Sequence, residues 1–388
     1  MFLEHWVATA TTILTVASLA YFLLALWAAR AYRHMRQRRQ PSIYPPVSLL
    51  KPAKGVDPGM YKDLVSHCQQ DYPAEYEIIF GVRSMDDPAV PVIQRLKEEF
   101  PNHNLRLVVC PETLGANGKV STLVQMLPQA RFDHLLINDS DVRVSPQYLR
   151  NVVRLFSSNG SPHPVGLVTA LYRGRVHRSL GSRLESLGIA TDFMPGVLMA
   201  RWLEHGIHFG MGSTLAITRQ ALDAIGGLQP LVDHLGDDYE IGARISRAGF
   251  RVALAREVVE TSVPSYHFRQ FLDHQLRWAR NLRNVRPAGN WGLVVTFGLP
   301  WALLNVAACR ASIGSIVLLG LVLFARFWLA LSVGVGILRD RRLLRSLWLL
   351  PLRDCVALGI WLWSFADNHV HWRGERFLLR QGKLTRAD

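Results

Sequence analysis

Charge is scarce in this chain, because only 19% of its 388 residues are charged whereas 49% are hydrophobic. Cysteine is scarcer still: there are four, with no Cys-x-x-Cys spacing, which argues against a disulfide framework and fits a reducing compartment. The chain also lacks a nucleotide P-loop signature, a His-Glu-x-x-His motif and a Gly-x-Ser-x-Gly elbow. These absences exclude the commonest signatures of P-loop hydrolases, zinc proteases and serine hydrolases.

Acidic residues are also in deficit, with 30 Asp and Glu against 44 Lys and Arg, which gives a formal net charge of +14. Many of the basic residues lie beside apolar segments: Arg30, Arg33, Arg36, Arg38, Arg39, Arg339, Arg341, Arg342 and Arg345. Arginine in such positions marks the cytoplasmic face of a membrane. Nucleic-acid binding would instead interleave basic and aromatic residues on a recognisable module. We therefore expect a lipid bilayer, and no nucleic acid, as a partner.

The apolar residues are concentrated at the two ends of the chain. Residues 8–29 are almost wholly uncharged, and about 20 apolar residues span a bilayer. Because the arginines follow this run, we expect an uncleaved anchor with the next residues in the cytoplasm. Residues 291–309 and 313–338 are long enough to span again. Residues 347–366 include Arg353 and Asp354, each costing about 2.5–3.5 kcal/mol at a helix centre. These charges favour an interfacial or re-entrant segment, and the sequence leaves a full span open as well.

The middle of the chain has the pattern of a soluble α/β domain. Short apolar runs (VSLLKP, EIIFGV, LRLVVC, HLLIN) alternate with helix-like segments. This pattern predicts an α/β fold with a mostly parallel sheet and transmembrane helices at both ends. We expect an anchor with a basic juxtamembrane segment (1–41), a cytoplasmic domain (42–288) and a C-terminal membrane region with a basic tail (289–388). Ligands of such sheets bind at the carboxyl ends of the strands.

The sharpest chemical signal is Asp139-Ser140-Asp141, directly after the strand HLLIN. Two carboxylates one residue apart at a strand end can share Mg²⁺ or Mn²⁺, which prefer oxygen ligands. Such a cation would neutralise a diphosphate leaving group. A turn that contains two aspartates is the plain alternative, and the position after a strand favours the metal site.

Two further acidic pairs have both a structural and a chemical interpretation. Asp86 and Asp87 follow the strand EIIFGV, where Asp also caps helices. Asp237 and Asp238 open a helix-like stretch, where acidic residues also suit the helix dipole. The chemical alternative for this second pair is a general base that deprotonates a hydroxyl.

The basic candidates lie in two segments. Arg277 and Trp278, in the run that begins at His274, can clamp a diphosphate and cover a sugar, or simply form a basic face under the membrane. The loop from Gly115 to Lys119 offers a lysine for a phosphate contact, although a plain turn is the more frequent outcome of such a sequence.

In this order, the motifs resemble those of metal-dependent, inverting glycosyltransferases of the family-2 type. Within that group the chain is similar to ceramide glucosyltransferases and bacterial hopanoid glycosyltransferases. The matching stretches extend over nearly the whole chain: SLLKPAKGVDP, QDYPAEYEIIFGVRSMDDPA, INDSDVRVSP, FGMGSTLAITRQAL, GDDYEIGARISRAGFR, HQLRWARNLR and HWRGERF. The resemblance implies a nucleotide-sugar-binding, GT-A-like fold.

The resemblance also implies a role for each matched residue. Asp238 is the expected general base, and Asp139 and Asp141 are the expected metal ligands. The residues assigned to the donor are Pro52, Lys54, Asp87, Lys119, Asp139 and Asp237. Arg277 and Trp278 match the Arg-Trp ending of the family's Gln/Arg-x-x-Arg-Trp motif, but His274 stands where the family has Gln or Arg. Val82 and Arg83 likewise replace the usual acidic pair at the second strand.

We therefore expect a hexosyltransferase that moves glucose or N-acetylglucosamine from a UDP-sugar to the hydroxyl of a membrane lipid, ceramide or a hopanoid, with inversion. The expected cofactor is Mg²⁺ or Mn²⁺, and the expected location is a bacterial inner membrane with the catalytic domain in the cytoplasm. The alternatives are a hopanoid N-acetylglucosaminyltransferase, a processive polysaccharide synthase, which needs more membrane crossings, and a non-catalytic membrane scaffold.

Overall fold

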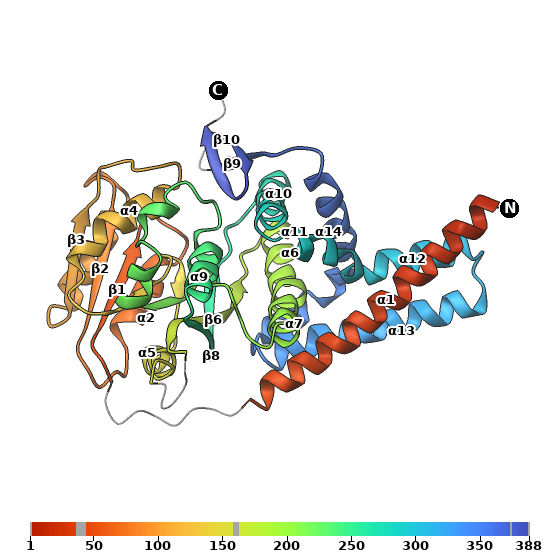
Figure 1. Cartoon of the computed structure of the whole chain (residues 1–388), viewed down its shortest axis with the longest axis horizontal. Helices are drawn as coiled ribbons and strands as arrows, with labels where there is room; N and C mark the ends of the chain where they lie inside the picture. Colours follow the sequence, from red (N-terminus) through yellow and green to blue (C-terminus); the bar gives the residue numbers. More distant parts are fainter. Residues whose placement is uncertain (1, 36–43, 158–162, 373–374, 387–388) are drawn as a thin grey trace.

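The computed structural model describes residues 2–35, 44–157, 163–372 and 375–386. A sheet domain lies at one end, helices fill the centre, and a helical arm projects from the other end (Figure 1). The strands are β1 (Val47–Pro52), β2 (Tyr76–Val82), β3 (Asn104–Val109), β4 (His134–Ile137), β5 (Val142–Arg143), β6 (Val165–Arg175), β7 (Leu215–Thr218), β8 (Arg251–Ser262), β9 (His369–Trp372), β10 (Glu375–Arg380) and β11 (Lys383–Arg386). The α-helices are α1 (Phe2–Arg33), α2 (Met60–Cys68), α3 (Ala89–Glu99), α4 (Gly118–Met126), α5 (Tyr148–Val153), α6 (Leu180–Gly188), α7 (Met194–Leu203), α8 (Arg219–Ala224), α9 (Asp237–Arg247), α10 (Phe268–Val285), α11 (Pro287–Gly292), α12 (Gly298–Ala308), α13 (Ile313–Ala330) and α14 (Leu350–Ser364).

Eight strands form one sheet in the order β3-β2-β1-β4-β7-β6-β8-β5. The strands β3, β2, β1 and β4 are parallel, whereas β7 runs antiparallel to both of its neighbours. Leu49, Ile78 and Leu136, from the three central parallel strands, have no exposed surface. Continuous apolar runs of this kind are typical of strands that are covered on both faces. The predicted mostly parallel α/β fold is confirmed.

The centre of the molecule is helical. The helices α6 and α7 are joined without a break by a π-helical turn, η2 (Ile189–Phe193), and such turns are frequent at functional sites. Helix α10 packs against α6, α14 and β9. The predicted boundary between residues 288 and 289 falls inside α11, and the boundary between residues 41 and 42 lies outside the described residues.

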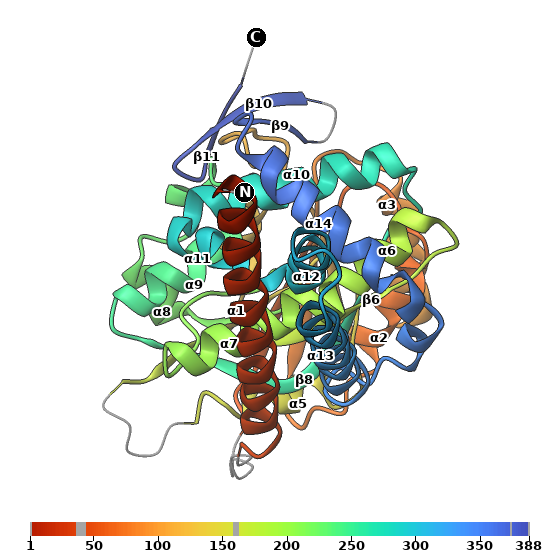
Figure 2. The same ribbon diagram turned by 90° about the vertical axis from the view of Figure 1, so that its right-hand side faces the viewer.

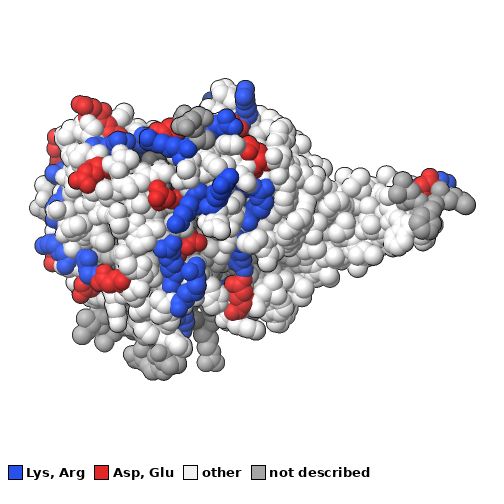
Figure 3. Space-filling model, turned by 45° about the horizontal axis from the view of Figure 1, so that its top comes forward, with Lys and Arg blue, Asp and Glu red and all other residues white. Residues whose placement is uncertain are grey.

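The projecting arm contains α1, α12 and α13, which lie side by side (Figures 1 and 2). Its surface is nearly uncharged between the body and the tip, whereas Lys and Arg gather on the body (Figure 3). Within the described residues, three helical segments are long and apolar enough to span a membrane: Glu4–Arg33, Ile313–Val335 and Leu347–Ser364. Transmembrane candidates at both ends of the chain are therefore confirmed. Of the predicted juxtamembrane arginines, Arg36, Arg38 and Arg39 lie outside the described residues.

The structure adds detail to the two outer C-terminal apolar runs. Residues 291–309 do not form one straight span, because segments Pro287–Thr296 and Gly298–Ala308 meet at an angle of 52°. The sequence Gly298-Leu299-Pro300 opens a new helix there, and proline is tolerated in a first helical turn but not inside a helix. For residues 347–366 the sequence left a span, a re-entrant segment and an interfacial helix open, and Leu347–Ser364 qualifies by length and composition as a candidate span.

Buried ion pairs explain how the last span accommodates its charges. Arg326 of α13 is 2% exposed and binds both carboxylate oxygens of Asp354 on α14, at 2.6 and 2.9 Å. Arg326 also pairs with Asp192 of η2, and Arg353 lies 3.3 Å from the second oxygen of Asp192. Pairing offsets much of the cost of removing these charges from water. The cluster ties two membrane helices to the centre of the molecule.

The C-terminal residues, expected to form a basic tail, fold into a second sheet with the order β11-β10-β9. This sheet packs on the loop that precedes α9: Leu384 donates its backbone N–H to Asp233, and Leu235 donates to Gly382. Arg280 of α10 donates to the carbonyl of His369. The end of the chain therefore braces both α9 and α10.

Candidate functional site

The aspartates at 139 and 141 lie where the sequence predicts, at the carboxyl end of β4. Asp139 is partly exposed, with 41% of its side chain accessible. Asp141 Oδ2 accepts a hydrogen bond of 2.7 Å from Thr261 Oγ1, and the Asp141 carbonyl accepts from the N–H of Ser262. These two bonds to β8 therefore hold the turn between β4 and β5 that carries the two carboxylates.

The predicted base, Asp238, lies in the first turn of α9. Its Oδ2 accepts a hydrogen bond of 2.7 Å from the backbone N–H of Gly212, and its Oδ1 accepts from the N–H of Tyr239. A Cβ on Gly212 would lie 3.2 Å from Asp238 Oδ2 and 3.5 Å from Asp139 Oδ2. The structure therefore brings Asp238 and Asp139 together on either side of one glycine.

Glycines let these segments approach so closely. A Cβ on Gly242 of α9 would lie only 2.1 Å from the backbone nitrogen of Gly210, and a Cβ on Gly210 would lie 2.7 Å from the carbonyl oxygen of Asp238. Both distances are shorter than real Cβ contacts. The FGMGS segment, which carries no assigned role in the sequence, therefore packs directly against α9, the helix that carries Asp238.

Lys119 reaches the carboxylates through a docked loop. Asn117 is fully buried, caps α4 with its side-chain oxygen and donates its amide to the carbonyl of His234. This places Lys119 Nζ 2.7 Å from Asp139 Oδ1 and 3.5 Å from Asp237 Oδ2. The loop is thus more than a plain turn, because its lysine bridges two of the predicted donor-site aspartates.

Burial and crowding of like charges shift the carboxyl groups of this cluster. Burial, reinforced by the charge of Asp139, raises the pKa of Asp141 to about 7. Burial and the charge of Asp237 raise the pKa of Asp238 to about 6, although Lys119 acts in the opposite direction. A carboxylate with a pKa near neutrality suits a general base.

The donor-site candidates nearer the chain start lie on the neighbouring strands β1 and β2. Asp87 Oδ1 accepts hydrogen bonds from the backbone N–H groups of Gly55 and Ala89, at 2.8 and 2.9 Å. Asp87 therefore holds the exposed loop that carries Lys54, and it also accepts a hydrogen bond from the first N–H group of α3. Pro52 ends β1 opposite Gly81 of β2. These residues line the strand ends, and within the described part of the chain the side-chain hydrogen bonds of Asp87 go to Gly55 and Ala89 and not to the cluster around Asp139.

The α10 candidates divide between two environments. Arg277 lies over the ring of Trp372 in the C-terminal sheet, 5.8 Å from its centroid. Trp278 packs against His274, with 5.1 Å between ring centroids, and against Phe193 at 6.2 Å. His274 Nδ1 lies 2.9 Å from Glu185 Oε2.

Two tyrosines connect these residues with the acidic cluster. Burial raises the pKa of Tyr172, and the charges of Asp238, Glu185, Asp139 and Asp141 raise it further. Burial likewise raises the pKa of Tyr266, which is also within reach of the charges of Glu185, Arg277 and Asp141. Glu185 and α10 therefore belong to the same electrostatic region as the aspartates.

Several of these residues were missed by sequence reasoning. Glu185 carries no motif, and its proximity to His274 comes only from the packing of α6 on α10. Lys51 is fully buried and donates to the carbonyl of Asp139, and burial lowers the pKa of this lysine to about 7. Its place at the end of β1, beside the strand that leads to Asp139, is the one signal that could have indicated it.

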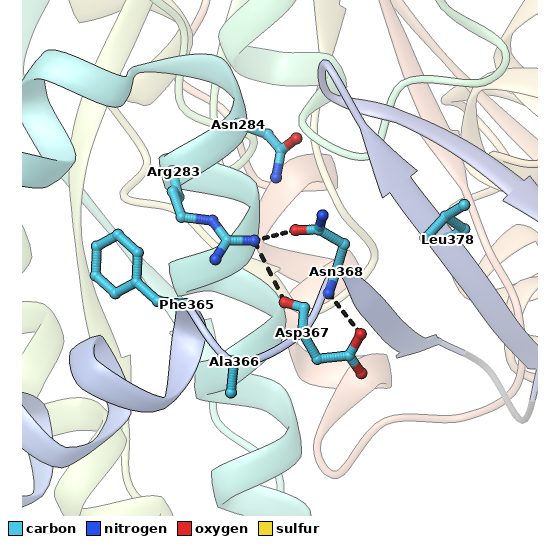
Figure 4. A pocket seen from close by; sticks show the side chains of 7 residues that line it. All are labelled: Arg283, Asn284, Phe365, Ala366, Asp367, Asn368 and Leu378. Atoms are coloured by element: carbon cyan, nitrogen blue, oxygen red, sulfur yellow. Dashed lines mark hydrogen bonds between the residues drawn. The ribbon is translucent and has the colours of Figure 1, made fainter.

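A pocket of about 510 Å³ lies between α10 and the C-terminal sheet (Figure 4). Its lining residues are Arg283, Asn284, Phe365, Ala366, Asp367, Asn368 and Leu378. Arg283 points toward Asn368 and Asp367 and bonds to both. The lining includes none of the predicted site residues, so this pocket is separate from the acidic cluster.

The residues at the end of β4 fit a divalent cation. Asp139 and Asp141 offer hard oxygen donors, and their mutual repulsion is the kind that a cation relieves. Among the described residues, no group of three or more His, Cys, Asp or Glu is placed to hold a metal. Asp139 and Asp141 are the residues that would hold such a cation, and the cation would supply positive charge for a diphosphate.

The fold is of the GT-A type found in glycosyltransferases. A mannosyltransferase from Pyrobaculum calidifontis, solved in complex with GDP-Man and Mn²⁺, shares the fold with a TM-score of 0.53 and 19% identity, covering 92% of this chain and 99% of that one. The chain belongs to glycosyl transferase family 21, whose model matches residues 10–385.

The curated relatives agree with this assignment. Ceramide glucosyltransferase 3 of Caenorhabditis elegans is 23% identical over 370 residues, which are 90% of this chain and 76% of the relative. The ceramide glucosyltransferase of Candida albicans is 31% identical over 144 residues, which are 32% of this chain and 26% of the relative. The predicted hexosyltransferase activity and the predicted resemblance to ceramide glucosyltransferases are confirmed.

Proposed function

We propose that this enzyme transfers glucose from a UDP-sugar to the primary hydroxyl of ceramide, with inversion at the anomeric carbon. The observation that carries the proposal is the meeting of Asp238 with Asp139 on either side of Gly212. A base and a cation-binding carboxylate side by side are what an in-line displacement requires. The names of the relatives favour glucose as the sugar and ceramide as the acceptor.

In this mechanism Asp238 takes the proton of the lipid hydroxyl as its oxygen forms a bond to the anomeric carbon. The bond from that carbon to the diphosphate oxygen breaks at the same time, and the negative charge of the leaving group grows. Asp139 and Asp141 would hold Mg²⁺ or Mn²⁺, which neutralises this charge when bound. Lys119 and Arg277 add fixed positive charge for the diphosphate, and Trp278 covers the sugar.

The remaining predicted residues receive supporting roles. Asp237 and Lys119 form a charge pair beside the base, and Asp87 holds the loop of Lys54 and Pro52 toward the donor nucleotide. His274 faces the acceptor. We further propose that the catalytic domain lies on the cytoplasmic side of a bacterial inner membrane, because arginines directly follow the N-terminal apolar run in the sequence.

A donor–acceptor matrix on the purified, detergent-solubilised chain tests the proposal. Labelled UDP-glucose and UDP-N-acetylglucosamine are each offered with ceramide, a hopanoid polyol or diacylglycerol, in Mg²⁺, Mn²⁺ or EDTA. We expect a glucosylated ceramide that disappears in EDTA. Transfer to another lipid would overturn the acceptor assignment, and a labelled product that forms in EDTA would overturn the metal-dependent mechanism.

A further inference from the structure

The pair of Glu185 and His274 has a defined hydrogen-bonding sense. The Glu185 side chain is 5% exposed and the His274 side chain 16%, and Oε2 of the first lies 2.9 Å from Nδ1 of the second. A carboxylate only accepts, so Nδ1 carries the proton and donates it to Glu185. In a neutral imidazole, Nε2 is then a hydrogen-bond acceptor, and it is the nitrogen that remains to bind a further group.

The surroundings of His274 are aromatic. Tyr266 lies 5.4 Å from its ring and Trp278 lies 5.1 Å from it. From Trp278 the row of rings continues through Phe193, at 6.2 Å, to Tyr172, at 5.8 Å from Phe193. Trp278 and Phe193 are each 38% exposed, so both offer ring surface to a ligand. One polar nitrogen in an aromatic wall suits an amphipathic ligand.

The same wall is anchored to the membrane helices. Asp192, next to Phe193, pairs with Arg326 of α13, and Gln275, next to His274, lies 3.4 Å from Arg353 of α14. At its other end the wall reaches Tyr172 on β6, within the electrostatic region of Asp238 and Asp139. The row of rings therefore leads from residues bonded to the candidate membrane helices to a buried tyrosine of β6.

We propose that Glu185 is a positioning residue that orients His274 so that Nε2 accepts a hydrogen bond from a second donor on the lipid headgroup, beside the hydroxyl that is glycosylated. The inference rests on the proposed function and adds an acceptor class: lipids with at least two neighbouring donors, such as a second hydroxyl or an amide N–H. A lysine or arginine in place of His274 would only donate hydrogen bonds. The pair of Glu185 and His274 instead presents Nε2 as an acceptor, so it selects a ligand that donates a hydrogen bond.

The test compares acceptors on the full-length enzyme at pH 8 with UDP-glucose. One acceptor is a short-chain ceramide, and the other is its analogue with the amide nitrogen and the secondary hydroxyl methylated. For the wild type we expect kcat/KM to favour ceramide by about tenfold or more, since a site that binds a donor rejects the analogue that lacks it. His274→Ala and Glu185→Ala should bring this ratio close to one, mainly by raising KM for ceramide.

Two further variants separate positioning from folding. Glu185→Gln can still accept from Nδ1 and should retain much of the preference, which a purely structural role of Glu185 would not produce. Glu257→Ala is the matched control, because Glu257 is also buried and bonded to side chains but lies against α5, away from α10. It should leave the acceptor ratio unchanged, and KM for UDP-glucose should stay within about twofold in all active variants.

The outcomes of this experiment are distinguishable. If His274→Ala and Glu185→Ala glycosylate ceramide with the wild-type ratio, the inference is wrong and the proposed function stands. If Glu185→Ala does not fold, the ratio of kcat/KM for ceramide to kcat/KM for the analogue, measured in Glu185→Gln and His274→Ala, still tests the inference. If the wild type binds UDP-glucose and glycosylates no lipid, the proposed function fails and takes the inference with it.

Discussion

Gly212 donates its backbone N–H to Asp238 Oδ2 at 2.7 Å, and its missing side chain leaves room for Asp139 on the other side. This contact fixes one oxygen of the base and leaves the carboxylate aimed at the space it shares with Asp139. The position of Asp238 therefore depends on Gly212, which has no side chain to take part in the reaction.

Replacing this glycine should disturb catalysis more than folding. In Gly212→Ala the new methyl group would lie 3.2 Å from Asp238 Oδ2 and push the base by a few tenths of an ångström. We expect kcat to fall by about 10- to 100-fold, because small misplacements of reacting groups are costly. Gly196→Ala is the control, since nothing lies within 4 Å of its Cβ. Equal kcat values in the two variants would contradict this prediction.

Lys119 should contribute to donor binding. Its removal in Lys119→Met leaves Asp139 and Asp237 without their shared positive partner, so the site becomes more repulsive toward a diphosphate. We expect KM for UDP-glucose to rise by about tenfold or more, in line with the loss of a charged hydrogen bond. The exposed Lys62→Met serves as the matched charge control. An unchanged KM in Lys119→Met would remove this lysine from the donor site.

The pH dependence of transfer should follow the base. Because burial and Asp237 raise the pKa of Asp238 to about 6, its reactive carboxylate form is lost as the pH falls through 6. We expect kcat/KM to fall about tenfold per pH unit below that point. Folding stability changes with pH in the opposite direction. Between about pH 4 and pH 6 the folded state binds this proton more tightly than the unfolded state does, so the free energy of unfolding decreases as the pH rises. A flat rate profile from pH 5 to 7 would contradict the assignment.

The membrane cluster gives a prediction about stability. Arg326→Met would leave Asp354, which is 3% exposed, buried without its bidentate partner. Breaking such a pair costs about 3–5 kcal/mol, so the melting temperature in detergent should fall clearly. Arg326→Met combined with Asp354→Asn should recover part of the loss, because the stranded charge is gone. Arg345→Met, on an exposed arginine, should have little effect.

Local patterns were sufficient to predict the parts of the enzyme that depend on neighbours in sequence. Apolar runs of four to seven residues predicted β1, β2 and β4 because each is buried on both faces. Asp87 and Asp139 follow β2 and β4 as predicted, because parallel strands end at one edge of a sheet. Their roles in the reaction remain predictions. The N-terminal candidate span followed from the apolar run of residues 8–29, and the helix there contains an 18-residue window with a mean hydropathy of 2.0.

The features that were missed depend on contacts across long stretches of chain. Glu185 and His274 are 89 residues apart, and nothing in either local sequence indicates their contact. In the sequence, Arg353 and Asp354 argued against a membrane span because they looked unpaired. Their partners, Asp192 and Arg326, lie on other elements of the fold. The C-terminal sheet escaped notice because its strands have only four to six residues and its support comes from α9 and α10.

The most direct test of the central claim is the formation of labelled glucosylceramide by the wild type and by Asp238→Asn, measured with Mn²⁺ and with EDTA and accompanied by calorimetric UDP-glucose binding. If Asp238 is the base, the variant should bind UDP-glucose with wild-type affinity and form product about 10²- to 10⁴-fold more slowly. Product formation at the wild-type rate by Asp238→Asn would contradict the account.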